Sequence, residues 1–109
     1  MDDKKLIDTD WLKSQYRGNM YELLTIYKRE NDECVSRMQS SLKAGDHDDV
    51  RAVAHKMKGS SRIIGAFSIE DLANLIERTF DVSEMESKVA ELQEHYVRLR
   101  VEIDKLTDR

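Results

Sequence analysis

The chain has 109 residues, of which 37% are charged, and a formal net charge of −4. One domain of this size can bury enough surface to fold without disulfides or metals, and the single cysteine, Cys34, has no partner for an internal disulfide. The acidic balance argues against nucleic-acid binding, which favours basic domains. No apolar run approaches the ~20 residues that a membrane span needs. We therefore expect a cytoplasmic domain that contacts no membrane.

The composition of the chain and its cap residues indicate helices. Proline is absent and only four glycines occur, whereas strand-rich domains need more turn residues. A short first helix is expected to be capped by Asp8 or Thr9 and to end at Gly18. A second helix is expected to start at Asn19 and to stop at Gly45.

Three more helices are expected after Gly45. Asp46 can cap the third, which Gly65 closes, and whose inward residues are Val50, Val53, Ala54, Met57, Ser61 and Ile64. Ser68 can open the fourth, with inward residues Ile69, Leu72, Ile76 and Phe80. A capping box at Ser83 can start the last. Its apolar seam is Met85, Val89, Leu92, Tyr96, Leu99, Ile103 and Leu106.

These elements predict an all-α fold, an antiparallel four-helix bundle with a short additional N-terminal helix. Neither a repeat nor a change in composition divides the chain. We therefore expect a single domain over residues 1–109, in which residues 1–5 and 107–109 are linker or frayed ends. A monomer is expected, because the seam of the last helix would be used within the bundle.

A strip of cations surrounds one histidine on the water-facing side of the third helix. Arg51, His55, Lys58 and Arg62 follow one another at spacings of four, three and four, which places them on one face. Gly59 lies one turn after His55. A glycine inside a helix costs roughly 0.5–1 kcal/mol relative to alanine. Close approach of another molecule to His55 would explain why this cost is tolerated.

An exposed imidazole among cations suits phosphoryl transfer. Neutral imidazole is a nucleophile near pH 7, and neighbouring cations favour the neutral form. A phosphorylated ring needs counter-charges, which Lys58 and Arg62 are placed to supply. Because phosphoryl transfer mainly requires positioning and charge stabilisation, a metal and a phosphodonor would come from a partner.

Residues 54–66 resemble the histidine-containing phosphotransfer (Hpt) domain, whose hallmark is Ala-His-x-hydrophobic-Lys-Gly-Ser and then Gly-Ala. The matching residues are Ala54, His55, Met57, Lys58, Gly59, Ser60, Gly65 and Ala66. The similarity extends over roughly residues 20–80, and Glu77 falls where the family often has a glutamate or glutamine near the active histidine. The resemblance implies a relay of phosphate between receiver aspartates in two-component signalling.

The resemblance also implies roles for individual residues. His55 would accept the phosphoryl group and Lys58 would assist it, while Gly59 would leave room for a docking receiver domain. Together with Gly59, we expect Arg51, Arg62 and Glu77 to contact that partner. No metal or cofactor would be bound by this chain, since Mg²⁺ would belong to the receiver. The domain would be a phosphocarrier without independent turnover.

Partners are expected to be receiver domains, bound transiently, with no nucleic acid. Apolar surface near Leu12, Tyr16 or Met20 is expected to join the basic strip in docking. The charged start of the chain is typical of a linker and favours the terminal domain of a hybrid sensor kinase over a free-standing protein. Two alternatives remain: a non-catalytic bundle that binds or dimerises through the last helix, and a module phosphorylated by a chemotaxis-type kinase.

Overall fold

The computed structural model describes residues 6–108, which contain five helices and no strand. The helices are α1 (Thr9–Gln15), α2 (Met20–Lys43), α3 (His47–Ile63), α4 (Phe67–Arg78) and α5 (Val82–Thr107). The predicted all-α fold is confirmed. The linker predicted for residues 1–5 and the frayed end at Arg109 lie outside the described residues. Thr107, predicted to fray, still belongs to α5, and its hydroxyl donates to the carbonyl of Ile103.

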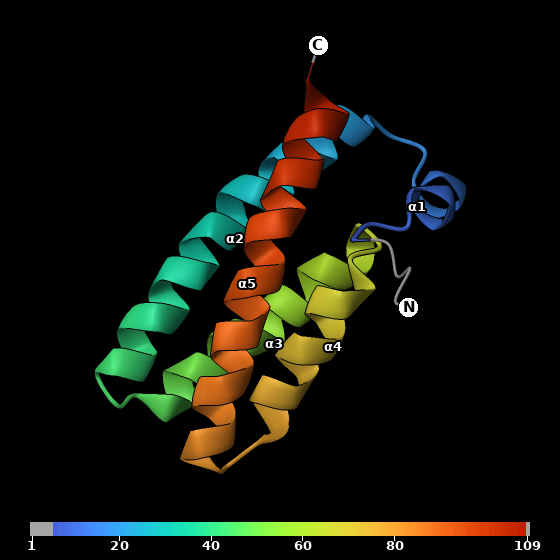
Figure 1. Ribbon diagram of the computed structural model, residues 1–109. Helices are drawn as coiled ribbons and strands as arrows, with labels where there is room; N and C mark the ends of the chain where they lie inside the picture. Colours follow the sequence, from blue (N-terminus) through green and yellow to red (C-terminus); the bar gives the residue numbers. More distant parts are fainter. Residues whose placement is uncertain (1–5, 109) are drawn as a thin grey trace.

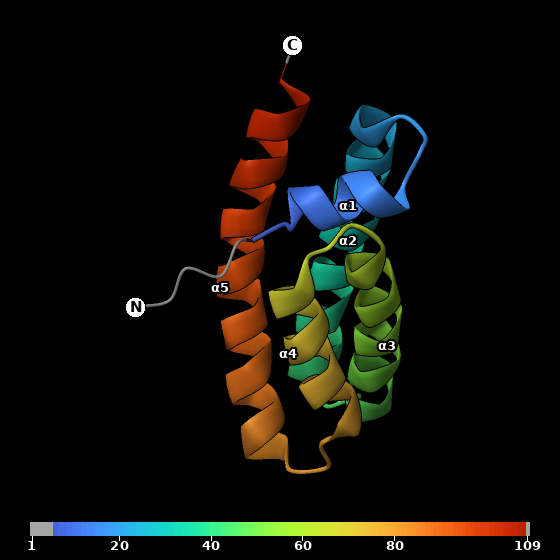
Figure 2. The same cartoon turned by 90° about the vertical axis from the view of Figure 1, so that its right-hand side faces the viewer.

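Helices α2 to α5 pack side by side around a shared core (Figure 1). Helix α2 contacts α3 and α5, and α4 likewise contacts α3 and α5. The chain reverses direction at each of the connections between these helices (Figure 1). Helix α1 lies across one end of the group, beside the α3–α4 connection (Figure 2). The face that α3 turns away from the core is therefore flanked by α2 on one side and α4 on the other.

The core forms where the apolar residues of each helix recur at helical spacing. The predicted inward stripe of α3 is confirmed, because Val50, Val53, Ala54, Met57, Ser61 and Ile64 are all buried. The seam of α5 is also buried within the same core, at Met85, Val89, Leu92, Tyr96, Leu99 and Ile103, and only Leu106 is exposed. A dimer through this seam would require the core to open, which disfavours the interaction-bundle alternative.

Two predicted helix starts are wrong. Helix α4 begins at Phe67 with Ala66 as its N-cap residue and no capping side chain, because the chain turns directly into the helix from Gly65, whose φ is +77°. Helix α5 is capped by Asp81 rather than Ser83, since the Asp81 carboxylate accepts from the amide of Glu84. An equally good cap thus occurs earlier in the chain.

The caps predicted for the other three helices are confirmed. Asp8 caps α1, Asn19 caps α2 and Asp46 caps α3, each accepting a hydrogen bond from the amide three residues later. Such a cap typically stabilises a helix by about 1 kcal/mol. The cap at Asp46 fixes where α3 begins and therefore which of its residues face outwards.

Helix α1 is held against the α3–α4 connection. The amide of Asp8 donates to the carbonyl of Gly65, and the ring of Trp11 meets that of Phe67 edge-on at 5.1 Å between centroids. A Cβ on Gly65 would lie 3.1 Å from the Asp8 carbonyl oxygen, so this close approach requires glycine as much as the positive φ does. Leu12, on the inner side of α1, is completely buried. It therefore contributes nothing to an exposed docking surface, contrary to expectation.

Buried polar groups join α2 to α3. The hydroxyls of Tyr27 and Ser61 lie 2.7 Å apart, and both residues are buried. The side-chain amide of Asn31 donates through Nδ2 to the Tyr27 carbonyl, and its Oδ1 accepts from the hydroxyl of Ser60. Because buried polar groups must find partners, these bonds fix the register of α3 against α2.

Among the helices of residues 6–108, none is both long and apolar enough to cross a membrane.

Candidate functional site

His55 lies on the outward face of α3 with 68% of its side chain exposed. One turn later, a Cβ built on Gly59 would meet no atom within 4 Å. The space beside the imidazole is therefore open, and the glycine does not serve tight packing within the molecule. The outward face of α3 can accommodate a partner at this point without moving any element of the bundle.

Glu77 fixes the orientation of the imidazole from the neighbouring helix. Its Oε2 lies 2.6 Å from Nδ1 of His55, across the contact between α3 and α4. A carboxylate oxygen accepts, so Nδ1 of a neutral ring carries the proton and donates it to Glu77. The lone pair is then on Nε2. Nε2 is the ring nitrogen available to an electrophile outside the molecule.

Lys58 holds the other oxygen of the same carboxylate. Its ammonium lies 2.6 Å from Oε1 of Glu77 and 3.5 Å from the side-chain oxygen of Asn74. The hydrogen bond from Lys58 lowers the pKa of Glu77 most, the bond from His55 lowers it further, and burial partly opposes both. Glu77 is therefore ionised at neutral pH. His55, Glu77 and Lys58 form one connected group, in which the negative charge lies between a ring N–H and an ammonium.

The two arginines of the predicted strip differ in their surroundings. Arg51 is only 18% exposed. Its guanidinium pairs with Asp48, donates to the carbonyl of Thr79 and covers the ring of Phe80 at 4.5 Å from the centroid. Arg62 is 74% exposed, and its recorded ion pair, with Glu70 on α4, is long at 3.8 Å. Arg51 thus braces the α4–α5 connection, whereas Arg62 remains accessible.

The position of Phe80 explains why Arg51 is less exposed than Arg62. It was predicted to face the core from the end of the fourth helix, but α4 ends at Arg78 and Phe80 is 81% exposed. An exposed aromatic ring beside an arginine provides a cation–π contact. The sequence pattern could not predict this contact, because it depends on where α4 ends and how the chain turns towards α5.

The model of the family described as the Hpt domain matches residues 22–109. The chain belongs to the Hpt domain family. Every residue of the His55 site lies inside the match, while α1 precedes it. No curated protein and no solved structure matches the chain significantly. Hpt domains are phosphocarrier modules that serve histidine phosphotransfer in phosphorelays and interact with response-regulator receivers.

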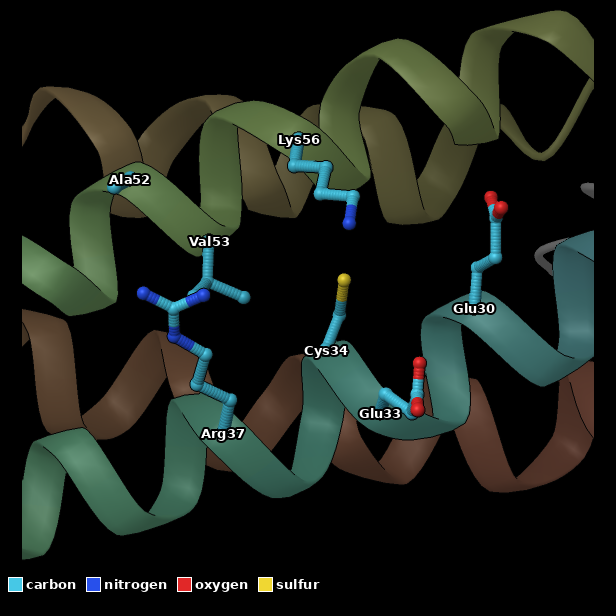
Figure 3. A pocket seen from close by; sticks show the side chains of 7 residues that line it. All are labelled: Glu30, Glu33, Cys34, Arg37, Ala52, Val53 and Lys56. Carbon is cyan, nitrogen blue, oxygen red and sulfur yellow. The ribbon is translucent and has the colours of Figure 1, made fainter.

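The other flank of α3 in this Hpt domain contains a groove that sequence reasoning missed (Figure 3). The cavity measures about 190 Å³ between α2 and α3 and is lined by Glu30, Glu33, Cys34, Arg37, Ala52, Val53 and Lys56. Lys56 extends from α3 towards the thiol of Cys34 (Figure 3). Burial nevertheless raises the pKa of that thiol above its ordinary value, which keeps it in the unreactive protonated form.

Metal ligands are not grouped in the part of the Hpt domain that the structure describes. Among residues 6–108, no three His, Cys, Asp or Glu side chains are placed to hold an ion together. The histidine is instead contacted by one carboxylate, which suits ring orientation rather than metal binding.

Proposed function

We propose that this Hpt domain accepts a phosphoryl group from a receiver-domain aspartate on Nε2 of His55 and passes it to another receiver. The antiparallel four-helix bundle with its short leading helix would be the rigid support for that histidine. The observation that carries the proposal is the contact between Nδ1 and Glu77, which leaves Nε2 free beside the open space at Gly59.

The transfer step requires no general base from this chain. The Nε2 lone pair of His55 attacks phosphorus, the Nε2–P bond forms, and the bond from phosphorus to the receiver aspartate oxygen breaks. Its electron pair leaves with that carboxylate. The proton on Nδ1 stays in place, and the positive charge that develops on the ring is paired with Glu77 at 2.6 Å. Passing the phosphoryl group to the next receiver reverses the step.

Lys58 assists in two ways. It holds Glu77 in position through Oε1, and it adds positive charge beside the incoming phosphoryl group. Mg²⁺ belongs to the receiver in this scheme, so this chain needs to supply only the nucleophile, its orientation and counter-charge.

The docking face lies on the α2 side of the site. Exposed apolar residues occur there, namely Ile63 on α3 at 57% and Ile26 on α2 at 41% exposure. Together with Leu23 they line a shallow cavity of about 100 Å³. Apolar surface next to an exposed nucleophile suits a small, transient interface. We infer a monomer that binds receivers in the cytoplasm, alone or as part of a hybrid sensor kinase.

The test is transfer of labelled phosphate from a panel of receiver domains with Mg²⁺, comparing the wild type with His55→Gln. We expect acid-labile, base-stable label on the wild type and none on His55→Gln. The matched control is His95→Gln, because His95 lies on α5 and contacts Arg98 rather than a residue of the site; this variant should be labelled fully. Label on His55→Gln would overturn the choice of acceptor.

A second part of the same experiment tests whether the phosphodonor is a receiver or a kinase domain. If folded wild type accepts no label from any receiver, an isolated ATP-binding domain of a chemotaxis-type kinase is offered instead. Labelling by that domain alone would replace the receiver-fed relay with the kinase-fed module. Labelling by neither would leave the interaction bundle as the remaining interpretation.

A further inference from the structure

Four cations occur on α3 close to His55, and the structure assigns them different tasks. Arg51 is bound to Asp48 on α3 and to Thr79 and the Phe80 ring at the α4–α5 connection. Lys56 extends across the groove towards Cys34 on α2 (Figure 3). Neither side chain is directed at the open space beside the imidazole. Among the cations of α3, the two that can supply counter-charge for a phosphoryl group are therefore Lys58 and Arg62.

Lys58 is already committed. Oε1 of Glu77 is shielded from water, and the ammonium of Lys58 at 2.6 Å is its contact. If Lys58 swung away to a phosphoryl group, this carboxylate oxygen would be left buried and unpaired, which is unfavourable. The loss would fall on the same side chain that holds Nδ1 of His55. Lys58 therefore acts best from where it is.

Arg62 is the cation that can move. Its side chain is 74% exposed and its pair with Glu70 is loose, at 3.8 Å. Arg62 follows His55 by seven residues, so it lies on the same outward strip about 10.5 Å along the helix axis. Side chains on a helix lean towards its N-terminus, and from its position Arg62, in an extended conformation, can reach over Gly59 towards His55. Gly59 has no side chain and leaves open space there.

We propose that Arg62 contacts the phosphoryl oxygens on His55 while Lys58 remains bound to Glu77. The inference rests on the proposed function and concerns the division of labour within that site. A guanidinium offers two parallel donors to phosphoryl oxygens. Arg62 exchanges its loose pair with Glu70 for this contact, and the phosphoryl group spans the remaining distance from the ring. Arg62 is thus a phosphoryl-binding residue, and Lys58 a positioning residue that acts through Glu77.

The experiment phosphorylates the protein chemically with phosphoramidate, in the absence of any receiver. This separates a contact with phosphate from a contact with a partner. The side-chain Nε–H signal of Arg62 and the ammonium signal of Lys58 are followed by ¹H–¹⁵N NMR before and after phosphorylation. We expect the Arg62 signal to shift and the Lys58 signal to stay. A shift at Lys58 with none at Arg62, on protein labelled at His55, would overturn the assignment.

Variants provide the kinetic arm. Arg62→Gln should slow transfer to a receiver about three- to tenfold, since an exposed charged contact is worth of the order of 1 kcal/mol. Arg62→Lys should restore part of the rate, and added salt should shrink the difference. Arg98→Gln is the matched control, because it removes an exposed arginine of α5, outside the site and the docking face, and it should leave the rate unchanged. Equal rates for Arg62→Gln and wild type would overturn the proposal.

The two proposals fail differently. If the Arg62 signal shifts on phosphorylation but no receiver exchanges phosphate with the protein, the contact stands and the receiver relay falls. If receivers exchange phosphate at full rate with Arg62→Gln, the relay stands and the contact falls. Circular dichroism of each variant checks that the helices are intact, which we expect for a side chain as exposed as Arg62.

Discussion

The two flanks of α3 carry polar clusters of opposite character. Towards α4, His55 and Lys58 share the carboxylate of Glu77, and the histidine is 68% exposed. Towards α2, the hydroxyls of Tyr27 and Ser61 meet inside the core. The first cluster is charged and open to a partner, whereas the second is neutral and closed. One helix therefore keeps its reactive group and its structural anchors on separate faces.

This separation has an energetic basis. A neutral hydrogen bond between buried groups typically contributes about 1 kcal/mol, and losing one partner costs more. Charged pairs near water contribute little to stability because solvent and salt screen them. Burial raises the pKa of Tyr27 well above its ordinary range, so its hydroxyl stays protonated. Substitutions in the Tyr27–Ser61 cluster should therefore change stability, and those in the cluster of His55, Lys58 and Glu77 should change transfer.

The largest expected effect is that of Met57→Ala, on the core side of α3. Met57 is completely buried, and removing such a side chain typically costs about 2–5 kcal/mol. Urea denaturation should show a lower midpoint, while the folded fraction keeps its capacity for phosphate at His55. A loss below about 1 kcal/mol would mean that the core is less tightly packed around α3 than the structure indicates.

Next in size is the contrast between Tyr27→Phe and Lys58→Gln. Tyr27→Phe leaves the hydroxyl of Ser61 buried without its partner, and should cost about 1–3 kcal/mol. Lys58 is 30% exposed, and the side-chain amide of a glutamine keeps an N–H donor for Oε1 of Glu77, so Lys58→Gln should cost less than about 1 kcal/mol but slow phosphoryl transfer. Chemical denaturation and transfer assays on both variants check the pair. The reverse ranking in stability would break the comparison between the two flanks.

A smaller effect of opposite sign is expected at Gly59. Because its added Cβ meets no atom within 4 Å, Gly59→Ala should stabilise α3 by roughly 0.5–1 kcal/mol. Gly45→Ala is the matched control, since the φ of Gly45 is +77° and alanine there costs roughly 1–2 kcal/mol. Thermal unfolding should move the two midpoints in opposite directions. Destabilisation by Gly59→Ala would show that this position serves packing.

The smallest effect is a pH dependence of stability at Glu77. Its pKa in the folded protein lies below its ordinary value of 4.5, chiefly because of the hydrogen bond from Lys58. A group with a depressed folded pKa stabilises the protein above its unfolded pKa and loses that contribution as the pH falls through the folded value. Relative to Glu77→Gln, the wild type should therefore lose stability on acidification below about pH 4.5. Parallel melting curves across that range would contradict the ion pair.

The sequence predicts the helices well where one local signal dominates. The inward stripe of α3 follows from residue spacing, and the caps at Asp8, Asn19 and Asp46 follow from residue type. It fails where signals compete or are absent. Asp81 precedes the expected cap at Ser83, and α4 starts without a capping side chain.

Only the part of the site that lies within one helix is predictable from the sequence. The motif around His55 and the run of cations are visible in the sequence, because neighbours on one helix have fixed spacings. What each cation contacts depends on how α4 and its connection pack against α3. The ion pair of Lys58 with Glu77 and the cation–π contact of Arg51 with Phe80 depend on tertiary packing, so the sequence alone does not predict them. Spacing alone treats Arg51, Lys58 and Arg62 as equivalent, and the structure separates them.

The most direct test of the central claim is the ¹⁵N NMR spectrum of the His55 ring near pH 8, before and after phosphorylation. The account predicts that the unmodified ring carries its proton on Nδ1, bonded to Glu77, and that phosphate appears on Nε2. A proton on Nε2 of the unmodified ring, or phosphate on Nδ1 or on another histidine, would contradict it.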